Sequence, residues 1–166
     1  WMGPVINRAS YNDFSTFCDE IRQAGGRFLT GGKTVKDGDY ARGFFCEPTF
    51  VVDLPVTHRL WQHEMFLPIT TIAPIDSLEE GMKLANSVNY GLTAGFYGSE
   101  KEAGWFFDLI QAGVTYANRP QGATTGAWPG YQPFGGWKAS GSSGKNAGGV
   151  YYLPLYMHEQ IHNLVR

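Results

Sequence analysis

Short apolar β-rich runs alternate along this chain with segments of helical periodicity, and this alternation limits the fold more than any other feature. The runs expected to form strands are 49–54, 69–75, 92–97 and 114–117. Runs of this length between helices indicate mostly parallel strands buried by helical layers. The sequence therefore predicts an α/β fold with a mostly parallel sheet flanked by helices.

Three serines mark the expected helix starts. Ser10, Ser77 and Ser99 are each followed, three positions on, by an acidic residue. In this pattern the serine oxygen accepts a hydrogen bond from an otherwise unpaired amide of the first turn. The glycines at 25–26 and Gly91 are expected to mark the C-terminal ends of the first two helices.

The end of the chain has a different character. Glycines concentrate after Gly113, and a strand-like run follows at 150–157. We expect residues 1–149 to form one α/β body and residues 150–166 a C-terminal strand and tail. That strand could pair inside the sheet or with another subunit.

Composition excludes several classes of partner. The 166 residues suit one domain, and the net charge of −2, without a Lys/Arg stripe, gives no reason to expect nucleic acid. No run reaches the roughly 18 apolar residues of a membrane span.

Two cysteines favour a reducing compartment, the cytoplasm or the matrix of a eukaryotic mitochondrion. Cys18 lies on the apolar face of the first helix and Cys46 beside a strand, so both are expected in the core.

The most informative motif is QPFGGWKASG at residues 132–141. Adjacent glycines after Pro-Phe let the backbone turn where a Cβ would clash, and an aromatic held this way can form a pocket wall. An ordinary tight loop is the alternative. Together with WQHEMFLP at 61–68, however, the string resembles the aldehyde dehydrogenase superfamily, which carries an acidic-apolar-Phe-Gly-Pro motif and then Pro-Phe-Gly-Gly-x-x-x-Ser-Gly. The segment NYGLTAG at 89–95 is also similar.

Within the superfamily the chain most resembles the 1-pyrroline-5-carboxylate dehydrogenase subfamily. The similarity lies in MGPVI at 2–6, Asn-Arg at 118–119, Thr-Gly-Ala at 125–127 and KNAGGVYYL at 145–153. The resemblance implies a partial catalytic domain and the oxidation of L-glutamate γ-semialdehyde to L-glutamate in proline degradation. It also implies NAD as cofactor and a homo-oligomeric full-length protein; NAD and NADP are not distinguished.

The resemblance assigns roles to five residues. Glu64 matches the glutamate that binds the nicotinamide ribose hydroxyls, and Phe66 the aromatic beside that ribose. Phe134 matches the residue that packs on the aldehyde's aliphatic chain. Gly126 and Ala127 match the loop whose amides bind the substrate carboxylate, although Ala127 stands where subfamily members have serine.

Other family features are not found. Leu67 replaces the usual glycine, and neither Cys18 nor Cys46 has the Gly-Gln context of the family's nucleophile. No G-x-G-x-x-G turn occurs. We expect no catalytic residue in this chain, an upstream part carrying the nucleophile, the base and the cofactor domain, and an inactive isolated chain.

Two further classes of protein have to be weighed. Residues 158–162 match the zincin motif H-E-x-x-H, with His158 and His162 as its two histidines. However, Pro154 lies just upstream and the chain ends at Arg166. We therefore expect no metal site and disfavour a zinc hydrolase. Another aldehyde dehydrogenase subfamily, or a non-catalytic binding module on the same scaffold, stays open.

Overall fold

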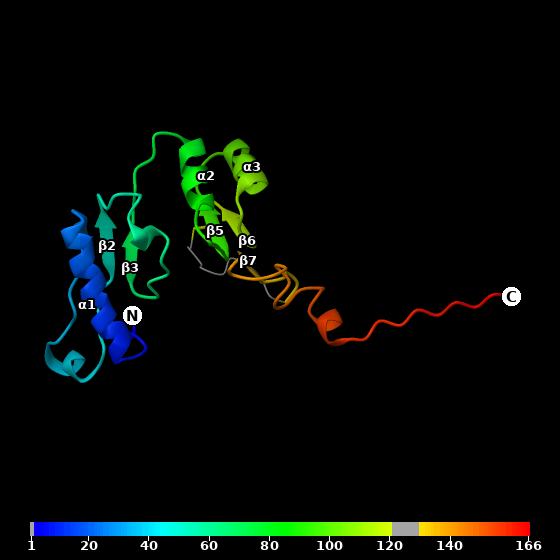
Figure 1. Cartoon of the computed structure of the whole chain (residues 1–166), viewed down its shortest axis with the longest axis horizontal. Coiled ribbons are helices and arrows are strands. Elements are labelled where there is room, and N and C mark those ends of the chain that lie inside the picture. The colour runs from blue at the N-terminus through cyan, green and yellow to red at the C-terminus, as the bar shows by residue number, and fades with distance from the viewer. Residues whose placement is uncertain (1, 121–129) are drawn as a thin grey trace. The chain divides into compact units, whose positions relative to one another are not determined.

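The computed structural model describes residues 2–120 and 130–166. The chain divides into two compact units, Trp1–Ile75 and Asp76–Arg166, called here the N-terminal and C-terminal units. Each combines helices with strands (Figure 1), which confirms the α/β class. Whether residues 150–166 act as a separate segment stays a prediction.

The N-terminal unit begins with helix α1, Arg8–Gln23. Its N-cap is Asn7, whose side chain accepts a hydrogen bond from the Ser10 amide at 2.8 Å, so the helix starts earlier than the expected serine cap. Asparagine caps as well as serine, and the earlier start adds most of a turn without moving the buried stripe. The expected stop is confirmed, because Gly25 follows the helix with a φ of 87°.

A mixed three-stranded sheet accompanies α1. Strand β2, Thr49–Val52, lies between β1, Arg27–Thr30, and β3, Ile69–Thr71. The β2–β3 pair is parallel and the β1–β2 pair antiparallel. Two short 3₁₀ helices, η1 (Gly38–Arg42) and η2 (Arg59–Trp61), lie in the connections.

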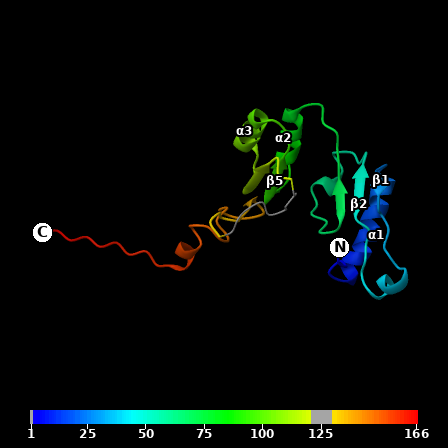
Figure 2. The same cartoon turned by 180° about the vertical axis from the view of Figure 1, so that it is seen from behind.

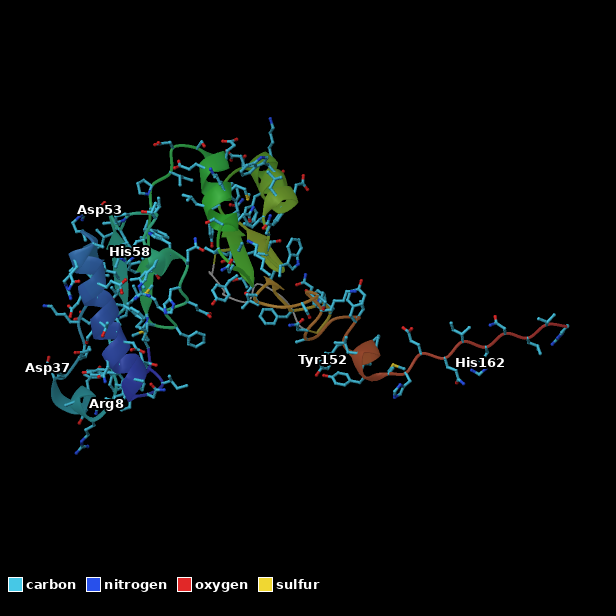
Figure 3. All side chains as sticks on the ribbon, in the orientation of Figure 1. Arg8, Asp37, Asp53, His58, Tyr152 and His162 are labelled. Carbon is cyan, nitrogen blue, oxygen red and sulfur yellow. The ribbon has the colours of Figure 1, made fainter. Side chains whose placement is uncertain are left out.

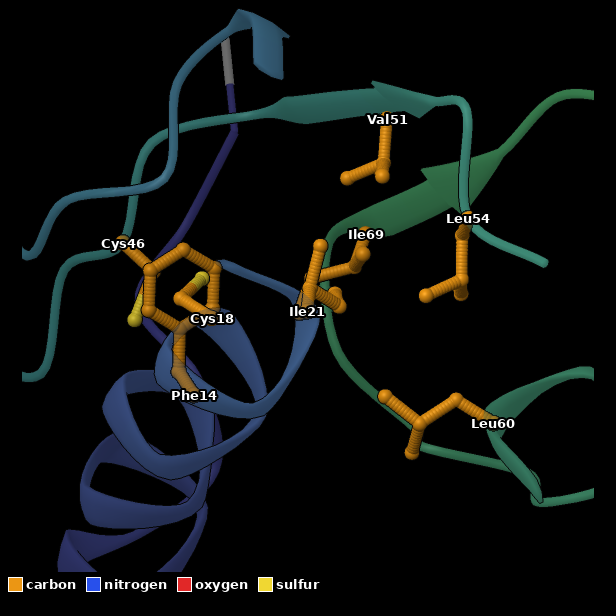
Figure 4. Packing of buried hydrophobic residues seen from close by; sticks show 8 residues of the cluster. All are labelled: Phe14, Cys18, Ile21, Cys46, Val51, Leu54, Leu60 and Ile69. Carbon is orange, nitrogen blue, oxygen red and sulfur yellow. The ribbon is translucent and has the colours of Figure 1, made fainter. Parts of the chain in front are cut away.

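The core of this unit lies between α1 and the sheet (Figure 4). Its buried members are Phe14, Cys18, Ile21, Cys46, Val51, Leu54, Leu60 and Ile69. Full burial of one large apolar side chain contributes about 1.5–3 kcal/mol, so this cluster is the main source of the unit's stability. Both cysteines are free and buried, as expected. Burial raises the pKa of each thiol to about 11.

In the C-terminal unit α-helices lie beside strands (Figure 2), and two of these strands pair in parallel. The helices are α2, Leu78–Asn86, and α3, Glu100–Leu109. The parallel strands are β5, Thr93–Phe96, and β6, Val114–Ala117. The core joins these elements: the rings of Phe96 and Phe106 stack at 5.2 Å, and Met82 packs on the same cluster.

The two remaining serine caps are confirmed. The Ser77 side chain accepts a hydrogen bond from the Glu80 amide, and Ser99 forms a complete capping box with Glu102. Hydrogen bonds from the Ser99 hydroxyl and amide lower the pKa of the Glu102 carboxyl. Local sequence thus determines where these helices begin.

The strand directions follow a simple division. The four apolar runs at 49–54, 69–75, 92–97 and 114–117 all contribute to parallel pairs. Each antiparallel pair includes a strand that was not expected: β1 pairs with β2, and the two-residue strands β4, Tyr90–Gly91, and β7, Trp137–Lys138, pair with each other. The three-stranded sheet is therefore mixed, whereas β4–β7 is antiparallel and β5–β6 is parallel.

Two expectations about the C-terminal unit are wrong. Gly91 does not stop α2, which ends at Asn86, but lies buried in β4, where a Cβ would come within 2.4 Å of the Gln111 carbonyl. The run expected as a strand at 150–157 contains a 3₁₀ helix, η3, Leu153–Tyr156, and each of its residues is exposed. Pro154 fixes φ and lacks the amide that a strand ladder needs. None of the helices in the described ranges is long and apolar enough to cross a bilayer.

Candidate functional site

The first candidate segment, residues 58–68, carries Glu64 and Phe66 in the N-terminal unit. Its start is tied to α1 by charge: the Arg59 guanidinium donates two hydrogen bonds to the Glu20 carboxylate, one of them 2.7 Å long. The Nε2 atom of His58 (Figure 3) lies 3.5 Å from the same carboxylate. His58 Nδ1 accepts a hydrogen bond from the Leu60 amide, which shapes the entry into η2. A bidentate arginine–carboxylate pair fixes the relative orientation of the two side chains as well as the distance between them.

Apolar side chains and one backbone bond hold the rest of this segment. Leu60 is buried, and Trp61, Met65 and Leu67 pack against the core. The Pro68 carbonyl accepts a hydrogen bond from an amide of β2. Leu67, where the family has glycine, therefore contributes to packing.

Glu64 and Phe66 are exposed, unlike the anchored residues around them. Glu64 is exposed and makes no hydrogen bond or ion pair with the part of the chain that the structure describes. The Phe66 side chain is 83% exposed, and its φ of 56° is unusual for a bulky residue. Such conformations persist where the surroundings impose them, often at binding sites.

Phe66 also borders an open apolar hollow of about 390 Å³. The hollow is lined by Phe66 and its two successors together with Met2, Gly3, Pro4 and Val5. This brings together the two stretches, 2–6 and 61–68, that carry the resemblance in this unit. A ring beside an apolar hollow and a free carboxylate two residues away can bind a flat group that carries a diol.

The second candidate segment, residues 132–147 in the C-terminal unit, carries Phe134. The Phe134 amide donates to the Ala147 carbonyl at 2.7 Å, and the Ala147 amide donates back at 2.9 Å. The Phe134 side chain is half-buried. Both backbone polar groups of Phe134 are therefore paired with one residue, which fixes the backbone that carries the ring.

Close backbone packing explains the glycine pair after Phe134. A Cβ on Gly135 would lie 2.7 Å from the Gly144 carbonyl carbon, and one on Gly136 would lie 2.4 Å from Ser140 Cβ. Neither glycine of the pair has a positive φ. The expected intolerance of side chains is confirmed, and its cause is close approach of other chain segments.

Lys138 is the left-handed non-glycine residue of this segment, with a φ of 53°. Its Nζ atom donates to the carbonyls of Asn86 and Val88 at 2.8 and 3.0 Å. No pattern in the sequence points to Lys138, Glu20 or Arg59. A lysine that bonds carbonyls 52 and 50 residues away leaves no local pattern to detect.

The predicted carboxylate-binding residues Gly126 and Ala127 lie outside the described residues. Residues 118–119, which precede them in the sequence, are held by hydrogen bonds. Asn118, with a φ of 51°, exchanges two side-chain hydrogen bonds with the backbone of Gly98, and the Tyr97 hydroxyl donates to the Arg119 carbonyl. The Asn-Arg pair at 118–119 is thereby fixed to the turn between β5 and α3.

The remaining candidates do not form reactive sites. Cys18 and Cys46 are buried with raised pKa values, whereas a nucleophilic thiol needs access and a lowered pKa. Residues 158–162 are not helical (His162 is labelled in Figure 3). His158 and His162 therefore do not share the helix face that a zincin requires. The structure thus pairs Glu64 with Phe66 in one unit and places Phe134 in the other.

Comparison with known proteins gives a consistent result. The model of the aldehyde dehydrogenase family matches residues 1–161. The 1-pyrroline-5-carboxylate dehydrogenase of Bacillus licheniformis is 39% identical over 158 residues, which cover 95% of this chain and 29% of that protein. A second such enzyme, from Bacillus subtilis, is 38% identical with the same coverage. The chain therefore spans less than a third of these relatives.

Solved structures agree. The structure of 1-pyrroline-5-carboxylate dehydrogenase from Thermus with bound NAD is 31% identical, with a TM-score of 0.81 over 93% of this chain and 28% of that one. Betaine aldehyde dehydrogenase from Staphylococcus aureus in complex with NAD+ is 28% identical. Its TM-score is 0.80 over 93% of this chain and 30% of that one.

Proposed function

The chain belongs to the aldehyde dehydrogenase family, and on that premise we propose that it is part of an NAD-dependent enzyme that oxidises L-glutamate γ-semialdehyde to L-glutamate. The observation that carries the proposal is the 39% identity to a 1-pyrroline-5-carboxylate dehydrogenase over 95% of this chain. The reaction would serve proline degradation. The chain would supply contacts to both reactants.

The residues of the 58–68 segment fit a bound NAD. The exposed Glu64 carboxylate can accept two hydrogen bonds from the nicotinamide ribose hydroxyls. The exposed Phe66 ring can pack beside that ribose, since the left-handed backbone holds it at the edge of the apolar hollow. When bound, NAD accepts the hydride that leaves the aldehyde carbon.

The residues of the C-terminal unit would hold the aldehyde. Phe134, fixed by its pairing with Ala147, would pack on the aliphatic chain of the substrate. The backbone amides of Gly126 and Ala127 would bind its carboxylate. Alanine lacks the hydroxyl that serine gives other members, so this contact would depend on backbone alone.

The bond-making groups would lie outside these 166 residues. Oxidation through a thioester needs a cysteine that adds to the aldehyde carbon, an oxyanion site, and a base that activates water for release of the acid. The two cysteines here are buried and protonated at neutral pH. We therefore propose that the isolated chain is inactive. From the family resemblance we also propose that the full-length protein is a homo-oligomer.

A second candidate is oxidation of a different aldehyde. The similarity to betaine aldehyde dehydrogenase, at a TM-score of 0.80, favours this alternative within the same family. A non-catalytic module on the same scaffold is the third possibility, distinguished by absence of a cysteine nucleophile from the complete protein.

The test is NADH formation measured with glutamate γ-semialdehyde, betaine aldehyde and a small unbranched aldehyde. The complete protein and this chain are assayed in parallel. Activity of the complete protein alone, with the highest kcat/KM for glutamate γ-semialdehyde, supports the proposal. If the complete protein prefers another aldehyde, the second candidate function is supported. If it is well folded but inactive on all three aldehydes, the non-catalytic module is favoured.

A further inference from the structure

We propose that Lys138 is a positioning residue for the aldehyde pocket, holding the backbone that presents Phe134. The inference rests on the proposed function for its effect on catalysis, but its structural part is independent of it. Lys138 lies four residues after Phe134, and its ammonium group donates to the backbone carbonyls of Asn86 and Val88, neither of which is assigned to substrate or cofactor.

The ammonium group of Lys138 lies where two helices end. Its two acceptors are the carbonyls of Asn86, the last residue of α2, and Val88. The Asn86 side chain in turn donates to the carbonyl of Leu109, the last residue of α3, and accepts from the Gln111 amide. Carbonyls at helix C-termini carry partial negative charge and lack helical partners. A half-buried cation is therefore well placed to join this region to β7.

The rest of β7 is attached to the same region by backbone bonds. It pairs with β4 in the register Tyr90 to Lys138, and the Ala139 amide donates to the Asn89 carbonyl. The Ser140 hydroxyl accepts a hydrogen bond from the Gly91 amide at 3.1 Å. Lys138 supplies the charged contact in this attachment, and it does so from a left-handed conformation.

Displacement of Lys138 would be transmitted to Phe134 because the intervening residues have no room to adjust. The Gly135 carbonyl lies against Gly113, and Gly136 lies against Ser140. A shift of β7 must then move the peptide that bears Phe134 or break its pairing with Ala147. The left-handed φ of Lys138 is itself unfavourable for a side-chain-bearing residue, which indicates that the contacts of its ammonium group hold it there.

The experiment compares four variants of the complete protein: K138M, K138R, K138G and the control K83M. Met keeps the aliphatic stem and removes the donors, Arg keeps donors and charge, and Gly removes the donors but accepts the left-handed backbone without strain. Lys83 is an exposed lysine in the last turn of α2. Backbone hydrogen exchange over residues 132–147 is measured with the KM values for glutamate γ-semialdehyde and for NAD.

We expect K138M and K138G to exchange at Phe134 and Ala147 about tenfold faster than the parent. Their KM for the aldehyde should rise about five- to twentyfold, while KM for NAD stays within about twofold. K138R should recover most of both effects, and K83M should match the parent.

Several outcomes would overturn the inference. They are unchanged exchange in K138M, parental behaviour of K138G, and equal changes in both KM values. If none of the Lys138 variants folds, the lysine supports the whole unit and the inference is equally wrong. If the parent oxidises no aldehyde, the proposed function fails, and hydrogen exchange alone still decides whether Lys138 holds the Phe134 backbone.

Discussion

The two candidate segments are held in place by different means. Residues 58–68 are fixed by side chains, through the ion pair of Arg59 with Glu20 and the apolar contacts of Leu60 and its neighbours. Residues 132–147 are fixed mainly by backbone, through the Phe134–Ala147 pairing and glycines in contact with other chain segments. One segment presents exposed groups, and the other a half-buried ring.

This difference has consequences for tolerance to substitution. Side chains that hold a segment can be shortened or neutralised, and neighbours relax around the loss. Backbone packed on backbone cannot move aside for one added methyl group. We therefore expect substitutions in the second segment to have larger effects on stability than those in the first.

The largest effect is expected for Gly113→Ala, because the new Cβ would lie 1.8 Å from the Gly135 carbonyl oxygen. Forced displacement of packed backbone should destabilise the protein by about 3 kcal/mol or more. The matched control is Gly104→Ala, since Gly104 lies within α3 with open space around it. That change should stabilise by about 0.5–1 kcal/mol. Urea denaturation measures both, and a Gly113→Ala protein as stable as the parent would show that the segment is not held by backbone.

Thiol chemistry distinguishes the units themselves, because both cysteines lie in the N-terminal core. With a pKa of about 11 in place of 9.0, Cys18 and Cys46 should react with iodoacetamide at pH 8 about a hundredfold more slowly than thiols of the unfolded chain. Mass spectrometry of labelled peptides follows the reaction with iodoacetamide. Fast labelling of native protein at pH 8 would mean that this core is open.

The raised pKa of these thiols also contributes stability to the folded state below pH 9, and this contribution is lost as pH rises toward 11.

The elements that could be predicted from sequence are those determined by neighbours in the chain. The Ser99 capping box and the burial of Cys18 follow from residues within a few positions, and both are confirmed. The runs at 49–54 and 114–117 form strands because their apolar residues can be buried only between helices and sheet.

The features that could not be predicted depend on distant partners or on competing local choices. Strand β7 exists through pairing with β4, and Lys138 takes its role from carbonyls 52 and 50 residues away. The error at 150–157 arose from composition, since apolar residues there favoured a strand that Pro154 and the exposure of the run oppose. The roles of Glu64 and Phe134 came from family resemblance and stay predictions.

Phe134→Ala should test the function of the backbone-held segment. Loss of the ring should cost about 1–3 kcal/mol of substrate packing, which corresponds to about a five- to 150-fold rise in KM for the aldehyde. KM for NAD should change little. Phe134→Leu keeps much of the apolar volume and should fall between this variant and the parent in steady-state kinetics. Equal losses for both reactants would remove Phe134 from the aldehyde pocket.

Glu64→Gln tests the exposed group of the side-chain-held segment. The amide keeps one acceptor oxygen but loses the charge, so NAD affinity should fall about tenfold and hydride transfer should slow. Stability should not change, because Glu64 has no partner among the described residues. Fluorescence titration with NAD and single-turnover kinetics measure these effects. Glu79→Gln, an exposed acid in the first turn of α2, is the control, and identical behaviour of the two variants would contradict the assignment.

The smallest effect is expected for Glu20→Gln, which weakens the attachment of residues 58–68 to α1. Arg59 is 56% exposed, so the pair should contribute less than about 1 kcal/mol, and less at high salt. Asp19→Asn breaks an ion pair to Arg22 on the same helix that does not touch the segment, and it should cost a similar amount. Only Glu20→Gln should speed hydrogen exchange over residues 58–68. If the two variants exchange alike, the ion pair does not hold this segment. The segments would then differ only in that residues 58–68 are anchored by apolar side chains and residues 132–147 by backbone and glycine contacts.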